Sequence, residues 1–315
     1  MAEDNITLPS DNITFYNRGN NLLTAILFFI TFLFGIVVNS VFVWVLGFRL
    51  KRTVNTIWFF HLIVSNIIFV MITPFLGTTF LMNSQWTFGV ALCKVINGLI
   101  SLCMFISVFL LTFISVDRYL LIFHPLWYRS HRTTRCASII TTSAWIVSVM
   151  LCSPYLVLRE TRITDRNKTI CFNNYALSDD WDNPEVQKLR KVVNWSMFTT
   201  RVVLGYLLPF FIITFCYVKI AFKIKSKKLA KTQKPFKVIL AAILSFFICW
   251  MPYHMHAGMS IWAPENTLQA IQACAVCLIC INSCFSPILY LCIGGNVNQV
   301  FKKSILTLFE SAFNT

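Results

Sequence analysis

Charged side chains are scarce in this sequence. Asp, Glu, Lys and Arg make up 12% of the 315 residues, about half of their share in a typical water-soluble domain. Apolar residues make up 57%, and they occur in long blocks rather than at the spacing of an amphipathic surface helix. A soluble enzyme is therefore excluded, and helices that span a lipid bilayer are expected.

Ionisable residues are also rare inside the apolar blocks. The main candidates are His61, His254 and His256, with Arg201 nearer one end of its block. Ion-coupled transporters need such groups near the bilayer midplane, so a transporter is disfavoured. The last block has no lysine for a retinal Schiff base, and no cluster of metal ligands or nucleophiles supports a membrane enzyme. No metal and no cofactor is expected.

Seven blocks are long enough to cross a hydrocarbon core, which takes about 20 helical residues. All are predicted to be helices, because a spanning segment must satisfy its backbone hydrogen bonds within itself. The predicted spans are 21–47, 55–82, 90–122, 134–158, 193–222, 236–262 and 268–292. The sequence predicts an all-α membrane protein, with a tail over 1–20, a seven-transmembrane helix bundle over 21–292 and a final segment over 293–315.

Basic residues indicate the orientation of this bundle. With the amino terminus outside, the inner segments would hold 17 of the 27 Lys and Arg residues but only two of the 12 Asp and Glu residues. The inner side would then carry the whole formal net charge of +15, as the positive-inside rule predicts. The basic excess therefore indicates topology and gives no reason to expect nucleic acid as a partner.

The two ends of the chain fit this orientation. Residues 1–20 lack the layout of a cleavable signal peptide, so the first span is expected to direct insertion. The sequons at Asn5, Asn12 and Asn167 all fall on predicted outer segments and are the candidate glycosylation sites. In the last segment, apolar residues at Phe301, Ile305, Leu308 and Phe309 share one helical face, which predicts a short amphipathic helix on lipid of the inner leaflet.

Ten of the twelve cysteines fall within the apolar spans, where a thiol behaves as a small hydrophobe. Cys93, at the outer start of the third span, and Cys171, in a long outer loop, would instead face an oxidising compartment. A bridge between them would hold the loop over the mouth of the bundle, and two free thiols are the alternative.

Short motifs stand at particular places in the predicted spans. They are Asp117-Arg118-Tyr119 in the third, Cys249-Trp250-Met251-Pro252 in the sixth and Ser286-Pro287-Ile288-Leu289-Tyr290 in the seventh. Asn39, Trp145, Pro209 and Tyr217 stand in the first, fourth and fifth. The ordered set resembles the rhodopsin-like (class A) G-protein-coupled receptors over essentially the whole chain.

The resemblance implies a receptor of the plasma membrane that is coupled to a heterotrimeric G protein, with a disulfide between Cys93 and Cys171. It also implies an activation switch, made of Asp117, Arg118, Tyr119, Tyr217, Trp250, Pro252, Pro287 and Tyr290. Asp117 can hold the adjacent guanidinium and offset its desolvation. The acid that often binds this arginine from the sixth span is missing in Lys231-Thr232-Gln233-Lys234, so a weakly held inactive state is expected.

The resemblance also locates a sodium pocket, which would be lined by Asn39, Asn66, Ser107, Asn282 and Ser286. Asn66 stands where the family usually has an aspartate, and Ser286 where it has asparagine or aspartate. Without a carboxylate, a sodium ion would lose its main counter-charge. We therefore expect that sodium does not stabilise the inactive state.

Residues near the outer mouth point to the ligand. Ile100 replaces the aspartate of amine receptors, which argues against an amine. Arg201 precedes Pro209 by eight residues and should face the interior, where an arginine requires a carboxylate or phosphate partner, although an internal ion pair or contact with lipid headgroups is an alternative. The candidate ligand contacts are Arg201, Asn97, Lys94, Tyr253 and His254.

Further segments are similar to the chemerin and formyl-peptide chemoattractant branch, among them Lys51-Arg52-Thr53-Val54-Asn55 and Cys171-Phe172-Asn173-Asn174. Trp250-Met251-Pro252-Tyr253-His254 most resembles an orphan receptor of that branch. The branch implies chemotaxis, an inhibitory-class G protein and a peptide or acidic lipid ligand. A decoy receptor that binds without signalling is the alternative, and arrestin recruitment is left open by the few hydroxyl groups of the tail.

Overall fold

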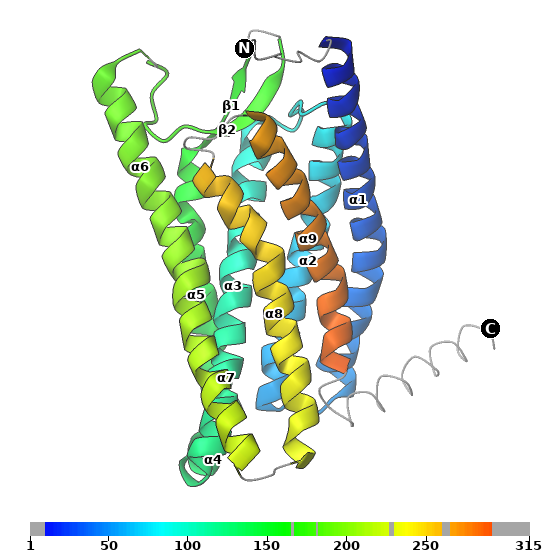
Figure 1. Cartoon of the computed structure of the whole chain (residues 1–315), viewed down its shortest axis with the longest axis vertical. Coiled ribbons are helices and arrows are strands. Elements are labelled where there is room, and N and C mark those ends of the chain that lie inside the picture. Colours follow the sequence, from blue (N-terminus) through cyan, green and yellow to red (C-terminus); the bar gives the residue numbers. More distant parts are fainter. Residues whose placement is uncertain (1–9, 165–166, 181, 227–229, 260–264, 292–315) are drawn as a thin grey trace, which may run out of the picture.

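The computed structural model describes residues 10–164, 167–180, 182–226, 230–259 and 265–291 (Figure 1). Their long helices form one elongated bundle. A hairpin of β1 (Arg159–Ile163) and β2 (Thr169–Asn173) covers one end, which we call the hairpin end. The short helix α4 (Pro125–His131) lies at the opposite end, which we call the α4 end.

Seven of the described helical segments are long and apolar enough to cross a membrane, which confirms the predicted seven-helix bundle. The helices are α1 (Ser10–Trp44), α2 (Val54–Leu81), α3 (Gly89–Phe123), α5 (Thr134–Leu158), α6 (Pro184–Val202), α7 (Leu208–Ser226), α8 (Ala230–Met259) and α9 (Glu265–Leu291). A π-helical turn, η1 (Val45–Arg49), continues α1, and a second, η2 (Val203–Leu207), joins α6 to α7. The amphipathic helix predicted within 293–315 lies outside the described residues.

Helix α3 runs through the centre of the bundle. Its Met104, Ile106 and Leu110 are fully buried, whereas large apolar side chains such as Leu33 of α1 and Phe222 of α7 are exposed. An apolar exterior is what a lipid environment requires of such a bundle.

The fifth span is longer than predicted, because α6, η2 and α7 form 43 continuous helical residues that begin at Pro184 rather than at 193. Asn183 caps the start by accepting a hydrogen bond from the backbone N–H of Glu185 at 3.0 Å, and Pro184 follows at the first helical position. At about 1.5 Å per residue the segment exceeds a hydrocarbon core of ~30 Å, so its polar first turns project beyond it at the hairpin end.

The π-helical turn η2 has a local cause. Pro209 has no backbone N–H, so the chain cannot form the regular hydrogen bond to the carbonyl of Gly205. The backbone N–H of Leu208 instead donates to the carbonyl of Val203, five residues earlier. One extra residue is thereby accommodated in the fifth span, between Arg201 and the rest of the helix.

Candidate functional site

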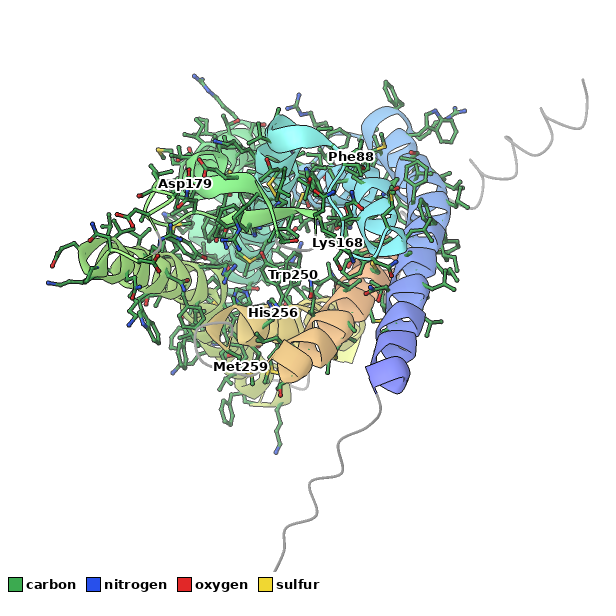
Figure 2. All side chains as sticks on the ribbon, turned by 90° about the horizontal axis from the view of Figure 1, so that it is seen from above. Phe88, Lys168, Asp179, Trp250, His256 and Met259 are labelled. Carbon is green, nitrogen blue, oxygen red and sulfur yellow. A yellow bond between two sulfur atoms is a disulfide. The ribbon has the colours of Figure 1, made fainter. Side chains whose placement is uncertain are left out.

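A cavity of about 610 Å³ opens between the helices at the hairpin end. Figure 2 looks into the bundle from this end, with His256 and Trp250 near the middle of the ring of helices. Side chains from α1, α2, α3, α5, α6, α8 and α9 line the cavity together with both strands of the hairpin. The size is that of a site for a small ligand or for the end of a peptide.

A disulfide fixes the hairpin over this cavity. Cys93 of α3 and Cys171 of β2 are bonded with their Cα atoms 5.8 Å apart, which confirms the predicted pair. The side-chain amide of Asn97, one turn below Cys93, donates to the carbonyl of Cys93 at 2.8 Å. Cys171 and its neighbour Phe172 thereby become part of the cavity wall.

One side of the cavity is basic. Arg201 lies against Tyr253, with its Cζ 5.1 Å from the ring centroid and its Nη1 3.5 Å from the hydroxyl oxygen to which it donates. Arg159, at the junction of α5 and β1, faces the same cavity, and the Nε atoms of both arginines are buried without a hydrogen-bond partner among the described residues. Burial lowers the pKa of Arg159. Tyr155 and Tyr175 line the cavity on the same side as the two arginines.

No Asp or Glu stands among the described residues of the cavity wall. The ion pairs between described residues join Asp117 to Arg118 and to Arg132 at the α4 end. Neither of them involves Arg201, so the described residues provide no internal ion pair for it. Two guanidinium groups thus share a cavity whose described wall provides no carboxylate. Buried cations of this kind require an anionic partner.

The other side of the cavity is apolar. Phe28 of α1, Phe69 and Phe80 of α2, and Val276 and Ile279 of α9 form this side. The cavity therefore offers charge recognition at one end and apolar contact at the other.

The structure brings three of the five expected ligand contacts together, because Asn97, Arg201 and Tyr253 all line the cavity. Lys94 and His254 do not line it. The Nζ of Lys94 donates to the carbonyl of Val157 at 3.4 Å. His254 is 6% exposed and packs 5.0 Å from the ring of Tyr206, since neighbouring residues of a helix point about 100° apart.

Sequence reasoning missed Arg159, Tyr155 and Tyr175 on the basic side. Arg159 directly follows an apolar block and was assigned to the outer loop, but the hairpin folds the chain back over the bundle. The signal that could have found it is Cys171, whose bond to Cys93 draws the hairpin, and with it Arg159, over the helix ends.

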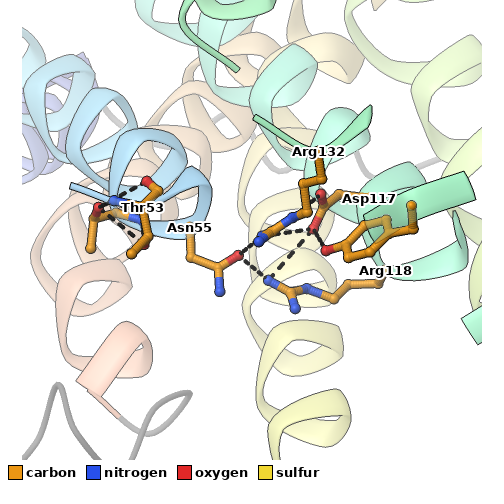
Figure 3. A network of polar contacts seen from close by, with 7 residues as sticks. Thr53, Asn55, Asp117, Arg118 and Arg132 are labelled. Atoms are coloured by element: carbon orange, nitrogen blue, oxygen red, sulfur yellow. Dashed lines mark hydrogen bonds and ion pairs between the residues drawn. The ribbon is translucent and has the colours of Figure 1, made fainter. Parts of the chain in front are cut away.

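The Asp117-Arg118-Tyr119 motif lies near the α4 end of α3. Asp117 and Arg118 belong to a polar cluster (Figure 3), whereas the ring of Tyr119 stacks on that of Phe123 at 4.6 Å. We call this cluster the α4-end network; its members are Asn55, Asp117, Arg118, Tyr128 and Arg132. Asp117 is expected to pair with Arg118, and the Oδ2 of Asp117 lies 3.7 Å from the Nη2 of Arg118. The pair with Arg132 is closer, since Arg132 Nε lies 3.0 Å from Oδ1 of Asp117. Burial and the Asp117 charge raise the pKa of Tyr128 to about 12, so Tyr128 stays a hydrogen-bond donor.

The other candidate switch residues belong to α7, α8 and α9. Trp250 is buried in α8, with its ring 5.5 Å from that of Tyr253, so it connects directly to the cavity wall. Pro252 of α8 and Tyr217 of α7 are buried as well, and Pro287 lies inside α9. Tyr290 also belongs to α9, but its side chain lies outside the described residues.

A buried polar cluster occupies the middle of the bundle. Asn39 Nδ2 donates to the carbonyl of Ser283 at 3.2 Å, the hydroxyls of Ser107 and Ser65 are 3.0 Å apart, and Ser286 donates to the carbonyl of Asn282 at 2.6 Å. Asn66 is also buried. The five residues of the expected sodium pocket are thus buried, and all of them are uncharged.

Of the candidate glycosylation sites, Asn167 lies in the exposed turn between β1 and β2 with a left-handed backbone (φ 53°), which asparagine tolerates. Asn5 lies outside the described residues, and so does the side chain of Asn12.

Comparison with known proteins agrees with these features. The family profile "7 transmembrane receptor (rhodopsin family)" matches residues 21–290. "Probable G-protein coupled receptor 33" of Pan troglodytes is 46% identical over 309 residues, covering 98% of this chain and 93% of that relative. "Chemerin-like receptor 1" of Rattus norvegicus is 36% identical (89% and 76% covered), and "C3a anaphylatoxin chemotactic receptor" of Oncorhynchus mykiss is 32% identical (93% and 79% covered).

Receptors of the rhodopsin family are multi-pass proteins of the plasma membrane that transmit the binding of an extracellular ligand to a G protein, and they are not enzymes. The seven helices, the disulfide-tethered hairpin and the match over nearly the whole chain agree in this respect. The chain belongs to the rhodopsin family of G-protein-coupled receptors, in the chemoattractant-receptor branch.

Proposed function

We propose that the receptor binds an extracellular peptide or lipid with an acidic end group, and that it activates an inhibitory-class G protein. The observation that carries the proposal is the pair Arg159 and Arg201, which share a cavity whose described wall contains no carboxylate. A ligand carboxylate between them would receive charge-assisted hydrogen bonds from both guanidinium groups.

The opposite side of the cavity restricts the ligand further. Phe28, Phe69 and Ile279 provide an apolar surface for an aromatic or aliphatic group. A peptide with an apolar residue next to its free carboxyl terminus fits this combination, and so does a fatty acid. Formyl-peptide recognition is not proposed, since Ser101 stands where those receptors carry an aspartate.

The hairpin end is proposed to face the outside of the cell, with the tail 1–20 on that side and 293–315 inside. Basic residues at the α4 end support this orientation: Arg129 and His131 lie in the last turn of α4, and Arg132 and Arg135 follow. The exposed Asn167 in the hairpin, a sequon asparagine, agrees with it.

The inhibitory class of G protein is supported by the similarity to chemoattractant receptors. The intact Asp117-Arg118-Tyr119 motif supports signalling rather than a decoy role. A nucleotide-exchange assay separates the two, because a decoy binds ligand without accelerating exchange on any G protein. Arrestin recruitment is measured in the same cells.

The ligand class is tested with matched probes. Short peptides with apolar carboxyl-terminal residues are each made as free acid and as amide, and fatty acids are paired with their alcohols. We expect the acids to be at least tenfold more potent, and we expect Arg159→Ala and Arg201→Ala to remove that preference. Lys94→Ala is the matched control, because Lys94 does not line the cavity. Amides as potent as acids would refute the proposal.

A further inference from the structure

The α4-end network is arranged around one amide group on α2. Asn55 Oδ1 accepts a hydrogen bond from Nη2 of Arg118 at 2.5 Å and another from Nη2 of Arg132 at 2.6 Å (Figure 3). Two cations, one on α3 and one between α4 and α5, thus share a single uncharged acceptor.

The carboxylate of Asp117 contacts both of these arginines, but it lies closer to Arg132 than to Arg118. Arg132 donates to it twice, from Nε at 3.0 Å and from Nη2 at 3.4 Å, whereas Arg118 comes no closer than 3.7 Å. Tyr128 donates to it as well, at 3.2 Å. Asp117 is 10% exposed, so water has little access to the remaining lone pairs.

Arg118 is therefore held mainly by Asn55. Among the residues that the structure describes, Asn55 is its one hydrogen-bond partner, and its Nε is buried without any. A neutral amide restrains a guanidinium less strongly than a two-bond pair with a carboxylate does.

We propose that Asn55 and Arg132 are positioning residues for Arg118 with opposite effects. Asn55 holds Arg118 against α2 in the resting receptor, and Arg132 keeps Asp117 from taking Arg118. This inference rests on the proposed function, G-protein activation, and adds that Arg118 leaves α2 and turns toward the G protein in the active receptor.

The direction in which each substitution changes basal activity follows from the geometry. Without Asn55, Arg118 loses its close partner while Arg132 still occupies Asp117, so the guanidinium is released and basal activity rises. Without Arg132, the Asp117 carboxylate retains Tyr128 but loses two charged hydrogen bonds, so it becomes available to the adjacent Arg118. Arg118 is then held more tightly, and basal activity falls.

The test measures ligand-free nucleotide exchange on a purified inhibitory-class G protein by purified receptor in lipid nanodiscs. We expect Asn55→Ala to raise the rate about three- to tenfold, equivalent to roughly 0.7–1.4 kcal/mol. Arg132→Ala should lower the rate at least threefold. Asn55→Asp should lower it too, because a carboxylate would pair with both arginines. Ser138→Ala, which removes a 3.3 Å hydrogen bond from Arg52 near the same end, is the control without effect.

An unchanged rate for Asn55→Ala, or a rise for Arg132→Ala, would contradict the inference. The thermal unfolding midpoint of the same proteins is independent of any G protein. Asn55→Ala should lower it, Asn55→Asp should raise it, and the effects of Asn55→Ala and Arg132→Ala should not add, because the residues share one network. If the unfolding midpoints shift as expected but the receptor accelerates exchange on no G protein, only the proposed function is refuted. If the midpoint shifts are additive or absent, the positioning roles of Asn55 and Arg132 are refuted.

Discussion

The guanidinium of Arg201 lies over the ring of Tyr253, with its Cζ 5.1 Å from the centroid and its Nη1 3.5 Å from the hydroxyl oxygen. The contact fixes a cation in the cavity without neutralising it. An aromatic face attracts a guanidinium yet leaves its N–H donors available to a ligand. The pair therefore presents a positioned positive charge to whatever enters from the hairpin end.

Arg201→Ala should reduce the potency of an acidic ligand by about ten- to 100-fold, the effect expected for hydrogen bonds to a charged group. Tyr253→Phe should reduce it less than threefold, because the ring face that positions Arg201 is retained. Concentration–response curves at matched surface expression provide the measurement. A loss of surface expression equal to the loss of potency would show that Arg201 serves folding instead.

Sodium ions should not alter agonist affinity in the wild-type receptor, since no carboxylate is found among the described residues of the buried cluster around Asn66 and Ser107. Asn66→Asp places a charge beside these hydroxyls and should make agonist affinity fall as sodium replaces potassium at constant ionic strength. Competition binding in the two salts tests this. A sodium effect in the wild type that Asn66→Asp leaves unaltered would be evidence against a site at this cluster.

His254 is buried in α8, and neither ring nitrogen has a hydrogen-bond partner in the part of the chain that the structure describes, so these polar atoms lose hydration without compensation. Replacing it by phenylalanine keeps a ring against Tyr206 and removes that cost. We expect His254→Phe to raise the thermal unfolding midpoint of the purified receptor and to change acid potency less than twofold. Potency reduced as strongly as in Arg201→Ala would instead place His254 in the ligand contact.

Asn167 lies in the exposed turn of the hairpin. If the hairpin end faces the outside of the cell, this sequon is accessible to the glycosylation machinery. Receptor expressed in mammalian cells should migrate faster on gels after enzymatic deglycosylation, and Asn167→Gln should remove one part of that shift. Serial substitution of Asn5 and Asn12 provides the comparison, and a mobility of the untreated, glycosylated receptor that Asn167→Gln leaves unchanged is the opposing result.

The helices were predictable because lipid imposes a simple rule on composition, namely about 20 apolar residues for each crossing. The same rule failed at Pro184, because the polar turns between 184 and 193 leave the bilayer and carry no hydropathy signal. Cys93 and Cys171 were paired through the family resemblance, and the structure confirms the bond.

The missed features depend on contacts between residues that are distant in sequence. Arg159 reads as a loop residue until the hairpin folds over the cavity. The preference of Asp117 for Arg132 over the adjacent Arg118 depends on how α4 turns the chain back toward α3, and no local pattern specifies that turn. Tyr253 and His254 are adjacent in the same helix and point about 100° apart, and the hydropathy pattern does not indicate which of them faces the cavity.

Because of the π-helical turn η2, the orientation of Arg201 depends on how many residues the fifth span contains as well as on their types. Each residue advances a helix by about 100°, so the extra residue in Val203–Leu207 sets the angle at which Arg201 meets the cavity relative to the rest of the fifth span. Deleting a single residue there would leave Pro209 in place and remove about 100° of helical advance, so Arg201 would turn away from Tyr253 although every residue of the described cavity wall is still encoded. The placement of Arg201 in the cavity is therefore sensitive to a one-codon deletion in a segment that contributes no side chain to the described cavity wall.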